Sequence, residues 1–255
     1  KMMLIRAMIL GLEIDLISPS KKPFYKNQKT YDFVAMTPIQ AFNSLSELGK
    51  VKKLIVGGAY VSLSLQESLI KAKVNAFETY GMMETLSHIA IRTMIDPVSE
   101  FKCLPDVKVQ QDERKCLVIN APKLDVKHLI TNDQVELLSS TRFRLIGRID
   151  NVINSGGLKL HPEQIERKLS KNLSFHFFID SISDSLLGEK VVLVVKDDPQ
   201  IEFKKLHKQI KECTSLEARE IPKAIICVKD FIQTYSGKIK RKASMDQKPQ
   251  RILNL

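Results

Sequence analysis

The stretch that decides the fold of this chain runs from Gly147 to Glu166 and reads GRIDNVINSGGLKLHPEQIE. It opens with a turn that carries two opposite charges, Arg148 and Asp150. The run from Ser155 to Gly157 lets the backbone turn where a Cβ atom would clash. Pro162 stands at the first turn of a predicted helix, because that position needs no backbone N–H donor. On these grounds alone, the stretch is an ordinary β-hairpin that leads into a surface helix.

The bulk composition indicates a globular protein of one or two domains. The chain has 255 residues, of which 44% are hydrophobic and 27% are charged, and this balance excludes a disordered chain. It contains no apolar run that approaches a membrane span and no visible signal peptide, so we predict no integral membrane segment. The four cysteines are far apart and lack metal-ligand spacing, which favours buried or free thiols in a reducing cytoplasm.

The net charge of +11 raises the hypothesis of nucleic-acid binding. The lysines are scattered, however, and the densest basic run, Lys238 to Lys242, has no interleaved aromatic residues for base stacking. We therefore predict no nucleic-acid partner and favour small polyanionic ligands.

Strand and helix patterns alternate between residues 33 and 80. The predicted strands are Phe33–Met36, Lys53–Ala59 and Val74–Tyr80. Thr37 and Pro38 begin one intervening helix as its N-cap and first residue, and Ser64 begins the other. This order predicts an α/β fold with a mostly parallel sheet and helices on its faces. The Gly57–Ala59 segment, at a strand end where α/β sheets bind ligands, is either a binding loop or a tight turn.

The Gly147–Glu166 stretch resembles the hinge motif of the adenylate-forming superfamily, which contains acyl-CoA synthetases, luciferases and peptide-synthetase adenylation domains. That motif has the form Gly-Arg-x-Asp, then Gly-x-Arg/Lys-x, then a helix start with Pro and Glu. Three further stretches resemble motifs of the same superfamily, in the superfamily's order. By this resemblance the chain is identified as a member of the superfamily, and the membership implies a fold, a reaction and a role for individual residues.

The stretch from Tyr80 to Thr85, YGMMET, resembles the superfamily's Tyr-Gly-x-Thr-Glu motif. The resemblance implies that this segment borders the nucleotide and the acyl group, and that Glu84 holds magnesium. Met83 stands where the superfamily has a threonine whose hydroxyl contacts the α-phosphate, and a thioether does not donate a hydrogen bond. Thr85 is adjacent, but nothing in the sequence shows that it replaces the missing hydroxyl.

Thr131-Asn132-Asp133 resembles the Thr-Gly-Asp motif, whose aspartate accepts hydrogen bonds from the ribose hydroxyls. Asn132 replaces the glycine, as asparagine often does at a left-handed backbone position. Without the resemblance, Asp133 would more often be a turn residue.

The tail of the chain resembles the superfamily's last motif at Thr234, Gly237, Lys238 and Arg241. An isolated Gly-Lys pair would be interpreted as a solvated basic hairpin, and only the other motifs favour the functional interpretation.

The resemblance implies activation of a carboxylic acid in two steps. The carboxylate first attacks the α-phosphorus of ATP, which gives an acyl-adenylate and releases pyrophosphate. A small domain then rotates about a hinge, and a thiol, here coenzyme A, displaces AMP. The implied cofactors and substrates are ATP, Mg²⁺ and coenzyme A.

The same resemblance implies a role for individual residues. Lys238 offsets charge in the first step, Asp133 and Arg148 bind ribose, and Asp150 is the hinge. The remaining predicted nucleotide-binding residues are Gly57, Gly58, Ala59, Tyr80, Gly81 and Met83. The predicted coenzyme A residues are Gly156, Gly157 and Lys159.

The implied fold is α/β, with two parts. Residues 1–146 are the C-terminal portion of a large AMP-binding domain with a mixed sheet and helices, and residues 147–255 are a small mobile α+β domain. The superfamily also has a Ser/Thr/Gly-rich phosphate loop that ends in Pro-Lys, and no stretch of the 255 residues resembles it. We therefore expect the chain to be the C-terminal part of a longer enzyme.

Within the superfamily, three stretches look like the o-succinylbenzoate–CoA ligases of menaquinone biosynthesis: Lys1–Ala7, Tyr80–Ala90 and Ile149–Gly157. The substrate of those ligases is an aromatic dicarboxylate, and Ser87 and His88 would meet one of its polar groups, although His88 is as readily a structural histidine. The alternatives are a ligase for another aryl or fatty acid, or a catalytically inactive remnant that acts as a binding module. The predicted partners are small molecules, and a homodimer is allowed.

Overall fold

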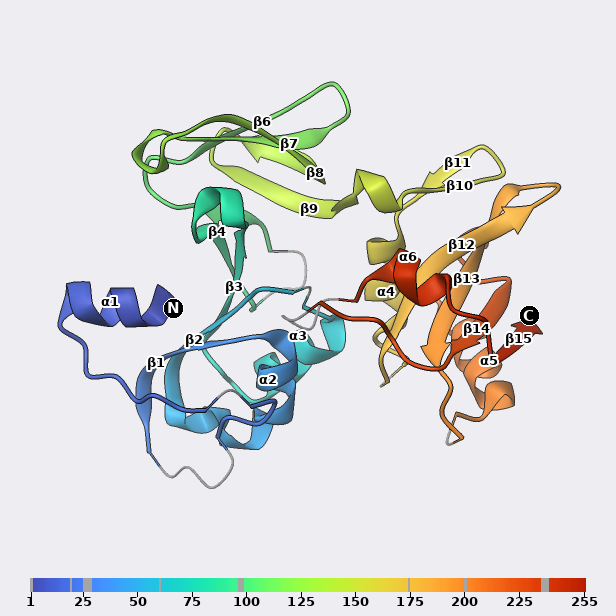
Figure 1. The fold of residues 1–255 in the computed structure, drawn as a ribbon, viewed down its shortest axis with the longest axis horizontal. Helices are drawn as coiled ribbons and strands as arrows, with labels where there is room; N and C mark the ends of the chain where they lie inside the picture. Colours follow the sequence, from blue (N-terminus) through green and yellow to red (C-terminus); the bar gives the residue numbers. More distant parts are fainter. Residues whose placement is uncertain are drawn as a thin grey trace.

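The computed structural model describes residues 2–18, 20–24, 29–59, 61–95, 99–173, 175–199, 201–234 and 239–255. Its strands form two sheets in two lobes, one of nine strands and one of six (Figure 1). The chain passes from the first lobe to the second between β9 (Arg142–Arg148) and β10 (Ile153–Ser155). No helix in these ranges is long and apolar enough to cross a membrane.

The first lobe contains a parallel unit of three strands. β1 (Tyr31–Met36), β2 (Val51–Val56) and β3 (Ala76–Gly81) lie side by side in that order and run parallel. The helices that connect them are α2 (Pro38–Asn43) and α3 (Leu63–Lys71). The predicted start of α2 is confirmed, because the Thr37 hydroxyl accepts from the N–H of Gln40 and the Gln40 side chain accepts from the N–H of Thr37.

The other strands of this sheet are antiparallel to their neighbours. They are β4 (His88–Thr93), β5 (Phe101–Cys103), β6 (Lys108–Gln111), β7 (Cys116–Ala121), β8 (Val126–Ser139) and β9, and the sheet order is β1-β2-β3-β4-β5-β9-β8-β7-β6. The prediction of a mostly parallel sheet is therefore wrong beyond β3. The segment between β3 and β4 is too short for the crossover that a parallel pair requires. The mixed sheet implied by the resemblance is confirmed.

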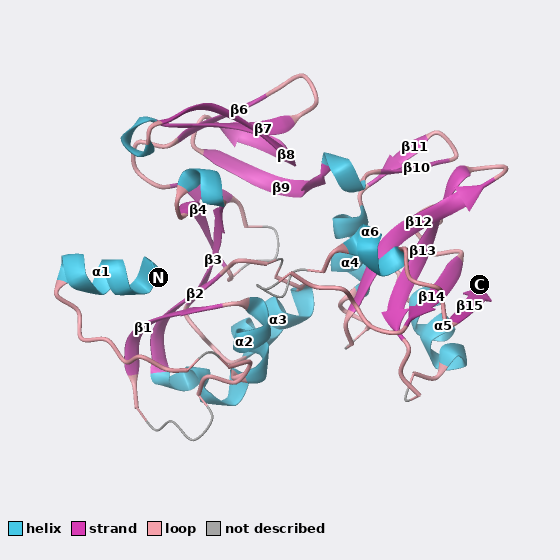
Figure 2. Cartoon of the chain, viewed as in Figure 1, coloured by secondary structure: helices cyan, strands magenta, loops and turns pink. Residues whose placement is uncertain are grey.

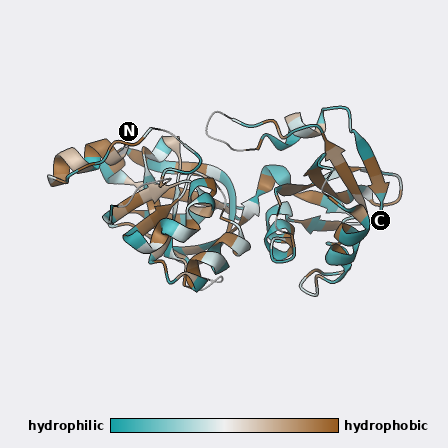
Figure 3. Cartoon of the chain, turned by 90° about the horizontal axis from the view of Figure 1, so that it is seen from below, coloured by the Kyte–Doolittle hydropathy of each residue, from teal (hydrophilic) through white to brown (hydrophobic). Residues whose placement is uncertain are grey.

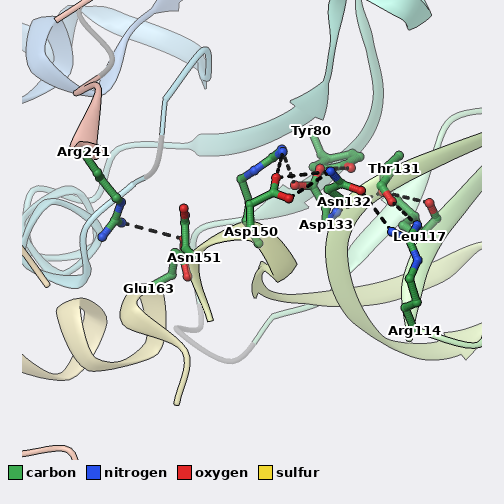
Figure 4. A network of polar contacts seen from close by, with 11 residues as sticks. Tyr80, Arg114, Leu117, Thr131, Asn132, Asp133, Asp150, Asn151, Glu163 and Arg241 are labelled. Carbon is green, nitrogen blue, oxygen red and sulfur yellow. Dashed lines mark hydrogen bonds and ion pairs between the residues drawn. The ribbon is translucent and has the colours of Figure 1, made fainter. Parts of the chain in front are cut away.

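Three aromatic rings form the centre of the antiparallel part of the first lobe. Tyr80, Phe101 and Phe143 are buried, and their ring centroids lie 5.3 to 5.8 Å apart. Ring pairs at such distances add stabilisation to the apolar area that they bury. They fix the ring of Tyr80 at the end of β3, with its hydroxyl directed toward β8 (Figure 4).

The second lobe is a small α+β unit (Figure 2). Its strands are β10, β11 (Leu158–Leu160), β12 (Phe177–Asp184), β13 (Gly188–Lys196), β14 (Ala224–Val228) and β15 (Arg251–Asn254), and its helices are α4 (Pro162–Leu169), α5 (Phe203–Lys211) and α6 (Arg241–Met245). Ile165 and Leu169 of α4 are fully buried in the core of this lobe. They are four residues apart, so they lie on the same face of the helix.

The helix α1 (Met2–Leu10) lies at the opposite end of the molecule from the second lobe (Figure 1). Ala7 is buried, whereas Met8 and Ile9 are each 76% exposed. Figure 3 shows this helix, beside the N mark, as largely hydrophobic. Arg6 is the polar side chain through which α1 contacts Ser87, near the start of β4.

A largely buried ion pair joins the end of the chain to α4. Both guanidinium arms of Arg241 donate to the carboxylate of Glu166, at 2.6 and 2.9 Å, and one arm also donates to the carbonyl of Ile179 at 2.6 Å. The two side chains are 21% and 12% exposed. Because a bidentate pair of this kind excludes other geometries, it fixes the start of α6 against α4.

We predict that Arg241→Ala lowers the free energy of unfolding by about 3–5 kcal/mol, because it leaves the carboxylate of Glu166 buried without its partner. The matched control is Arg251→Ala, whose pair with Asp197 is 43% and 33% exposed. That control loses about 1 kcal/mol or less. Urea denaturation of both variants measures the difference, and equal losses would show that the Arg241 pair does not hold this lobe.

Candidate functional site

The ends of β2 and β3 bring two of the predicted nucleotide-binding segments to one edge of the sheet. Gly57 follows β2 directly, and a Cβ atom there would lie 2.0 Å from the Thr79 hydroxyl oxygen of β3. Glycine permits this close approach, because a Cβ atom would displace the Thr79 hydroxyl. Gly58 and Ala59 continue from this point, and Tyr80 and Gly81 are the last residues of the neighbouring strand β3. Parallel strands present their carboxyl ends at one edge, where α/β sheets bind ligands.

At Gly81 the chain packs closely against Ser87 and His88, the predicted acyl-site residues. A Cβ atom on Gly81 would lie 2.4 Å from the carbonyl oxygen of Ser87, so only glycine admits the turn that leads into β4. An Arg6 guanidinium nitrogen donates to the Ser87 hydroxyl at 3.0 Å and lies 3.2 Å from Nδ1 of His88. Burial and the charge of Arg6 lower the pKa of His88, so its neutral ring accepts from Arg6. We call these three residues the Arg6 cluster.

Met83 and Glu84 lie on a short 3-10 turn after β3. The Met83 side chain is 91% exposed. Thr85 is fully buried, and its hydroxyl lies within hydrogen-bond distance of the N–H of Met82 (3.1 Å) and the carbonyl of Ser87 (2.8 Å). Thr85 is therefore used inside the turn, and in this arrangement it does not replace the hydroxyl that Met83 lacks.

The carboxylate of Asp133 is held by two donors (Figure 4). The Tyr80 hydroxyl donates to one oxygen at 2.6 Å, and Arg148 donates to the other at 3.1 Å. Asp133 and Arg148 are direct partners on the antiparallel strands β8 and β9, which places their side chains next to each other. Burial and the neighbouring carboxylate raise the pKa of Tyr80, so the phenol stays protonated and acts as the donor.

The same arginine reaches the predicted hinge. The second arm of Arg148 donates to Asp150 at 2.6 Å, and the Asn132 amide donates to both oxygens of Asp150, at 3.1 and 3.2 Å. The hydrogen bonds from Arg148 and Asn132 hold the pKa of Asp150 below its usual value. We call the resulting chain of side chains the hinge cluster; its members are Tyr80, Asn132, Asp133, Arg148 and Asp150.

The predicted left-handed backbone at Asn132 is wrong. Asn132 lies inside β8, and it is not among the residues of positive φ in the described part of the chain. The neighbouring Asp133 pairs with β9, and such pairing requires extended backbone. The asparagine therefore serves through its side chain.

The predicted coenzyme A residues lie on the second lobe. Gly156 and Gly157 form the turn between β10 and β11, and Lys159 is exposed in β11. The N–H of Gly156 donates to the carbonyl of Leu187 at 2.8 Å, which holds this hairpin on the turn between β12 and β13.

Lys238 lies outside the described residues. The segment that follows it lines a cavity of about 520 Å³ together with residues from the passage between the lobes. The cations that line this cavity are Arg148, Lys240, Arg241 and Lys242, with Asn151 and Asp246 beside them.

Glu84 is the candidate magnesium ligand. Among the described residues, no three His, Cys, Asp or Glu side chains converge on one point. Mg²⁺ in nucleotide enzymes is bound by one or two carboxylates, and phosphate oxygens and water supply the other ligands. The exposed carboxylate of Glu84, at the end of β3, fits that arrangement.

No protein-family model matches the chain. A solved protein from Dyadobacter fermentans, described as an acyl-CoA synthetase (AMP-forming)/AMP-acid ligase II-like protein, is 31% identical, and the match covers 96% of this chain and 73% of that one with a TM-score of 0.52. The chain belongs to the AMP-forming acyl-CoA synthetase family.

Two other relatives are both named for 2-succinylbenzoate. The 2-succinylbenzoate–CoA ligase of Escherichia coli is 23% identical over 197 residues, which cover 70% of this chain and 43% of the ligase. The o-succinylbenzoate CoA synthetase of Bacillus subtilis, solved with its acyl-adenylate, has the same fold, with a TM-score of 0.72 and 17% identity over 86% of this chain and 52% of that one. The chain thus spans about half the length of these two relatives.

Three residues with clear structural roles were missed as individual candidates in the sequence. Arg6 stands within the Lys1–Ala7 stretch, which carried a resemblance but no assigned role. The sequence suggests only a backbone role for Asn132, and it marks Arg241 only as part of a motif. The contacts of all three span long sequence distances, so no local pattern predicts them.

We predict that His88 makes stability fall as pH decreases below its usual pKa of 6.5. Because the folded-state pKa is lowered, the unfolded chain binds more protons in this range, and acid favours unfolding. Denaturation midpoints measured from pH 8 to pH 5 should fall more steeply in the native chain than in His88→Gln. Parallel pH profiles would contradict the buried, Arg6-facing position of this ring.

Proposed function

We propose that the protein containing this chain is an ATP-dependent acid–CoA ligase that forms an acyl-adenylate and then a thioester. The observation that carries the proposal is the hinge cluster. A ribose-type acceptor, Asp133, and a cation, Arg148, meet at the ligand-binding edge of the sheet, and Arg148 also contacts Asp150 in the passage between the lobes. Membership of the AMP-forming family supports the same reaction.

The proposed roles follow from the chemistry of these side chains. Asp133 accepts from both ribose hydroxyls, because a carboxylate has acceptor sites on both oxygens. Arg148 contacts the same ribose, and Gly57, Gly58 and Ala59 flank the adenine. An acid carboxylate attacks the α-phosphorus, and pyrophosphate leaves. In the second step, the thiolate of coenzyme A attacks the acyl carbonyl, and AMP leaves.

Glu84 holds the magnesium ion, which supplies positive charge to the phosphate oxygens. A Bacillus subtilis relative solved with ATP and a magnesium ion supports this assignment at the level of the fold. Tyr80 and Gly81 shape the same edge of the sheet. Met83 stands where a threonine would direct its hydroxyl at the α-phosphate, and it has no such donor.

We propose that the lobes correspond to the two predicted domains, residues 1–146 and 147–255, with Asp150 as the hinge, except that Gly147 and Arg148 belong to β9 of the first lobe. Rotation about it brings Gly156, Gly157 and Lys159 to the coenzyme A path for the second step. The cytoplasmic location and the homodimer that the sequence suggests remain predictions.

We propose that the acid is an aromatic dicarboxylate such as o-succinylbenzoate. The Arg6 cluster supports this substrate class, because a guanidinium and two polar side chains meet where we propose the acyl group to bind. A guanidinium matches the geometry of a carboxylate. The relatives named for 2-succinylbenzoate favour the same acid over a fatty acid.

The test of function is a direct assay of the protein with ATP, Mg²⁺, coenzyme A and a panel of acids. The expected products are AMP, pyrophosphate and the thioester of an aromatic dicarboxylate. Nucleotide binding without turnover of any acid would instead favour a second function, an inactive adenylate-forming remnant that acts as a binding module. The exposed thioether of Met83, where a hydroxyl donor is expected, is the observation that favours this alternative.

We predict that Arg6→Ala lowers kcat/KM for a dicarboxylate by about 10- to 100-fold, the effect of losing one hydrogen bond to a charged group. The kcat/KM for an otherwise identical acid that lacks the second carboxylate should change by less than about threefold. Arg142→Ala, which removes an exposed arginine paired with Glu100, serves as the control. Equal losses for both acids would show that Arg6 only supports the fold.

We predict that Lys238→Ala slows adenylation by about a hundredfold, because the lysine offsets charge only in that transition state. Thioester formation from pre-made acyl-AMP and coenzyme A should be nearly unchanged. Lys240→Ala, which removes a nearby lysine, is the matched control, and the two half-reactions are measured separately. If both steps slow alike, the lysine acts through general electrostatics, and the proposed rotation of the domain loses its support.

A further inference from the structure

The motif that Thr131-Asn132-Asp133 resembles has glycine at its centre, and this chain has an amide there. The backbone of Asn132 is extended within β8, so no conformational demand explains the residue. Its side chain donates to both oxygens of Asp150. We propose that Asn132 is a positioning residue that holds the hinge carboxylate against β8 and thereby sets the resting orientation of the second lobe.

The orientation of the Asn132 amide follows from its two neighbours. An Arg114 guanidinium nitrogen lies 3.4 Å from the amide oxygen of Asn132. A guanidinium only donates and a carboxylate only accepts, so the amide oxygen faces Arg114 and the amide nitrogen faces Asp150. Arg114 is itself held by Asp112, through a hydrogen bond of 2.9 Å. The first lobe therefore presents a prearranged donor to the hinge.

Asn132 makes a direct connection from β8 to Asp150. Arg148, two residues from Asp150 along the chain, reaches β8 only through its second pair, with Asp133. Asn132 is 18 residues away and lies on β8, so its contact ties the passage between the lobes to the sheet of the first lobe. The Asp150 side chain is 49% exposed, and Arg148 still donates to it when this contact is lost.

The catalytic consequence rests on the proposed two-step reaction. A hydrogen bond made in one lobe orientation and broken in the other biases the equilibrium between them. Its loss therefore changes the ratio of the adenylation rate to the thioester-forming rate, by about tenfold, a change typical for one hydrogen bond to a charged group. A purely structural role would slow both steps by the same factor.

The primary experiment measures lobe orientation directly and needs no turnover. Spin labels are placed at Lys108→Cys in β6 and Lys205→Cys in α5, two exposed positions in different lobes, with Cys103→Ser to remove the partly exposed native thiol. The distance distribution between the labels should be narrow in the labelled parent and broader in Asn132→Gly. Asn132→Asp, which keeps the shape of the side chain but replaces the donor by a second carboxylate, should broaden it at least as much.

Two controls make the result specific. Asn120→Gly, an exposed asparagine on the neighbouring strand β7, should leave the distribution unchanged. Asp150→Ala should broaden it, and Asn132→Gly should then add nothing, because its partner is already gone. A parent-like distribution in Asn132→Gly, or an additive effect in the double variant, would overturn the proposal. An inactive protein with the expected distances would reject the proposed function and leave this inference intact.

Discussion

The arrangement of the two lobes depends on one guanidinium group shared between two carboxylates. Arg148 ends β9, and its two arms contact Asp133 on β8 and Asp150 in the passage to β10. A planar, permanently charged group with donors on two edges is suited to this task. The Arg148 side chain is 48% exposed, so its pairs contribute little to stability. Their importance lies in geometry, because they align the end of one sheet with the start of the other.

The strong ionic interactions lie within the lobes. Glu78 and Arg92 form a pair in the first lobe whose side chains are 9% and 8% exposed, and Glu166 and Arg241 form the corresponding pair in the second. The contact between Lys171 and Glu67, which joins the lobes, is long at 3.9 Å and about half exposed on both sides. Buried pairs tolerate little displacement, whereas exposed pairs exchange readily with water. The buried pairs thus lie inside each lobe, and this contact between the lobes is an exposed one.

Met83 and Asn132 both depart from the superfamily's motifs, but their side chains have different surroundings. Met83 is 91% exposed, and the hydroxyl of the adjacent Thr85 is bonded inside the turn, so neither side chain supplies the missing hydroxyl in this arrangement. Asn132, in contrast, donates two hydrogen bonds to Asp150, the proposed hinge residue. A motif mismatch is therefore informative only when the surroundings of the new side chain are known.

The sequence by itself determined the elements whose signals are local. The cap of α2 at Thr37, the apolar stripe of Ile165 and Leu169, and the glycine turn at Gly156-Gly157 all follow from neighbouring residues, and motif order indicated the family. Only the tertiary structure decided the antiparallel course beyond β3, the contact of Arg6 with Ser87 and His88, and the role of Asn132. Each of these depends on groups 18 to 82 residues apart in the chain, or on the pairing of whole strands. Periodicity and capping rules describe a few successive residues, so they carry no information about which distant side chains meet.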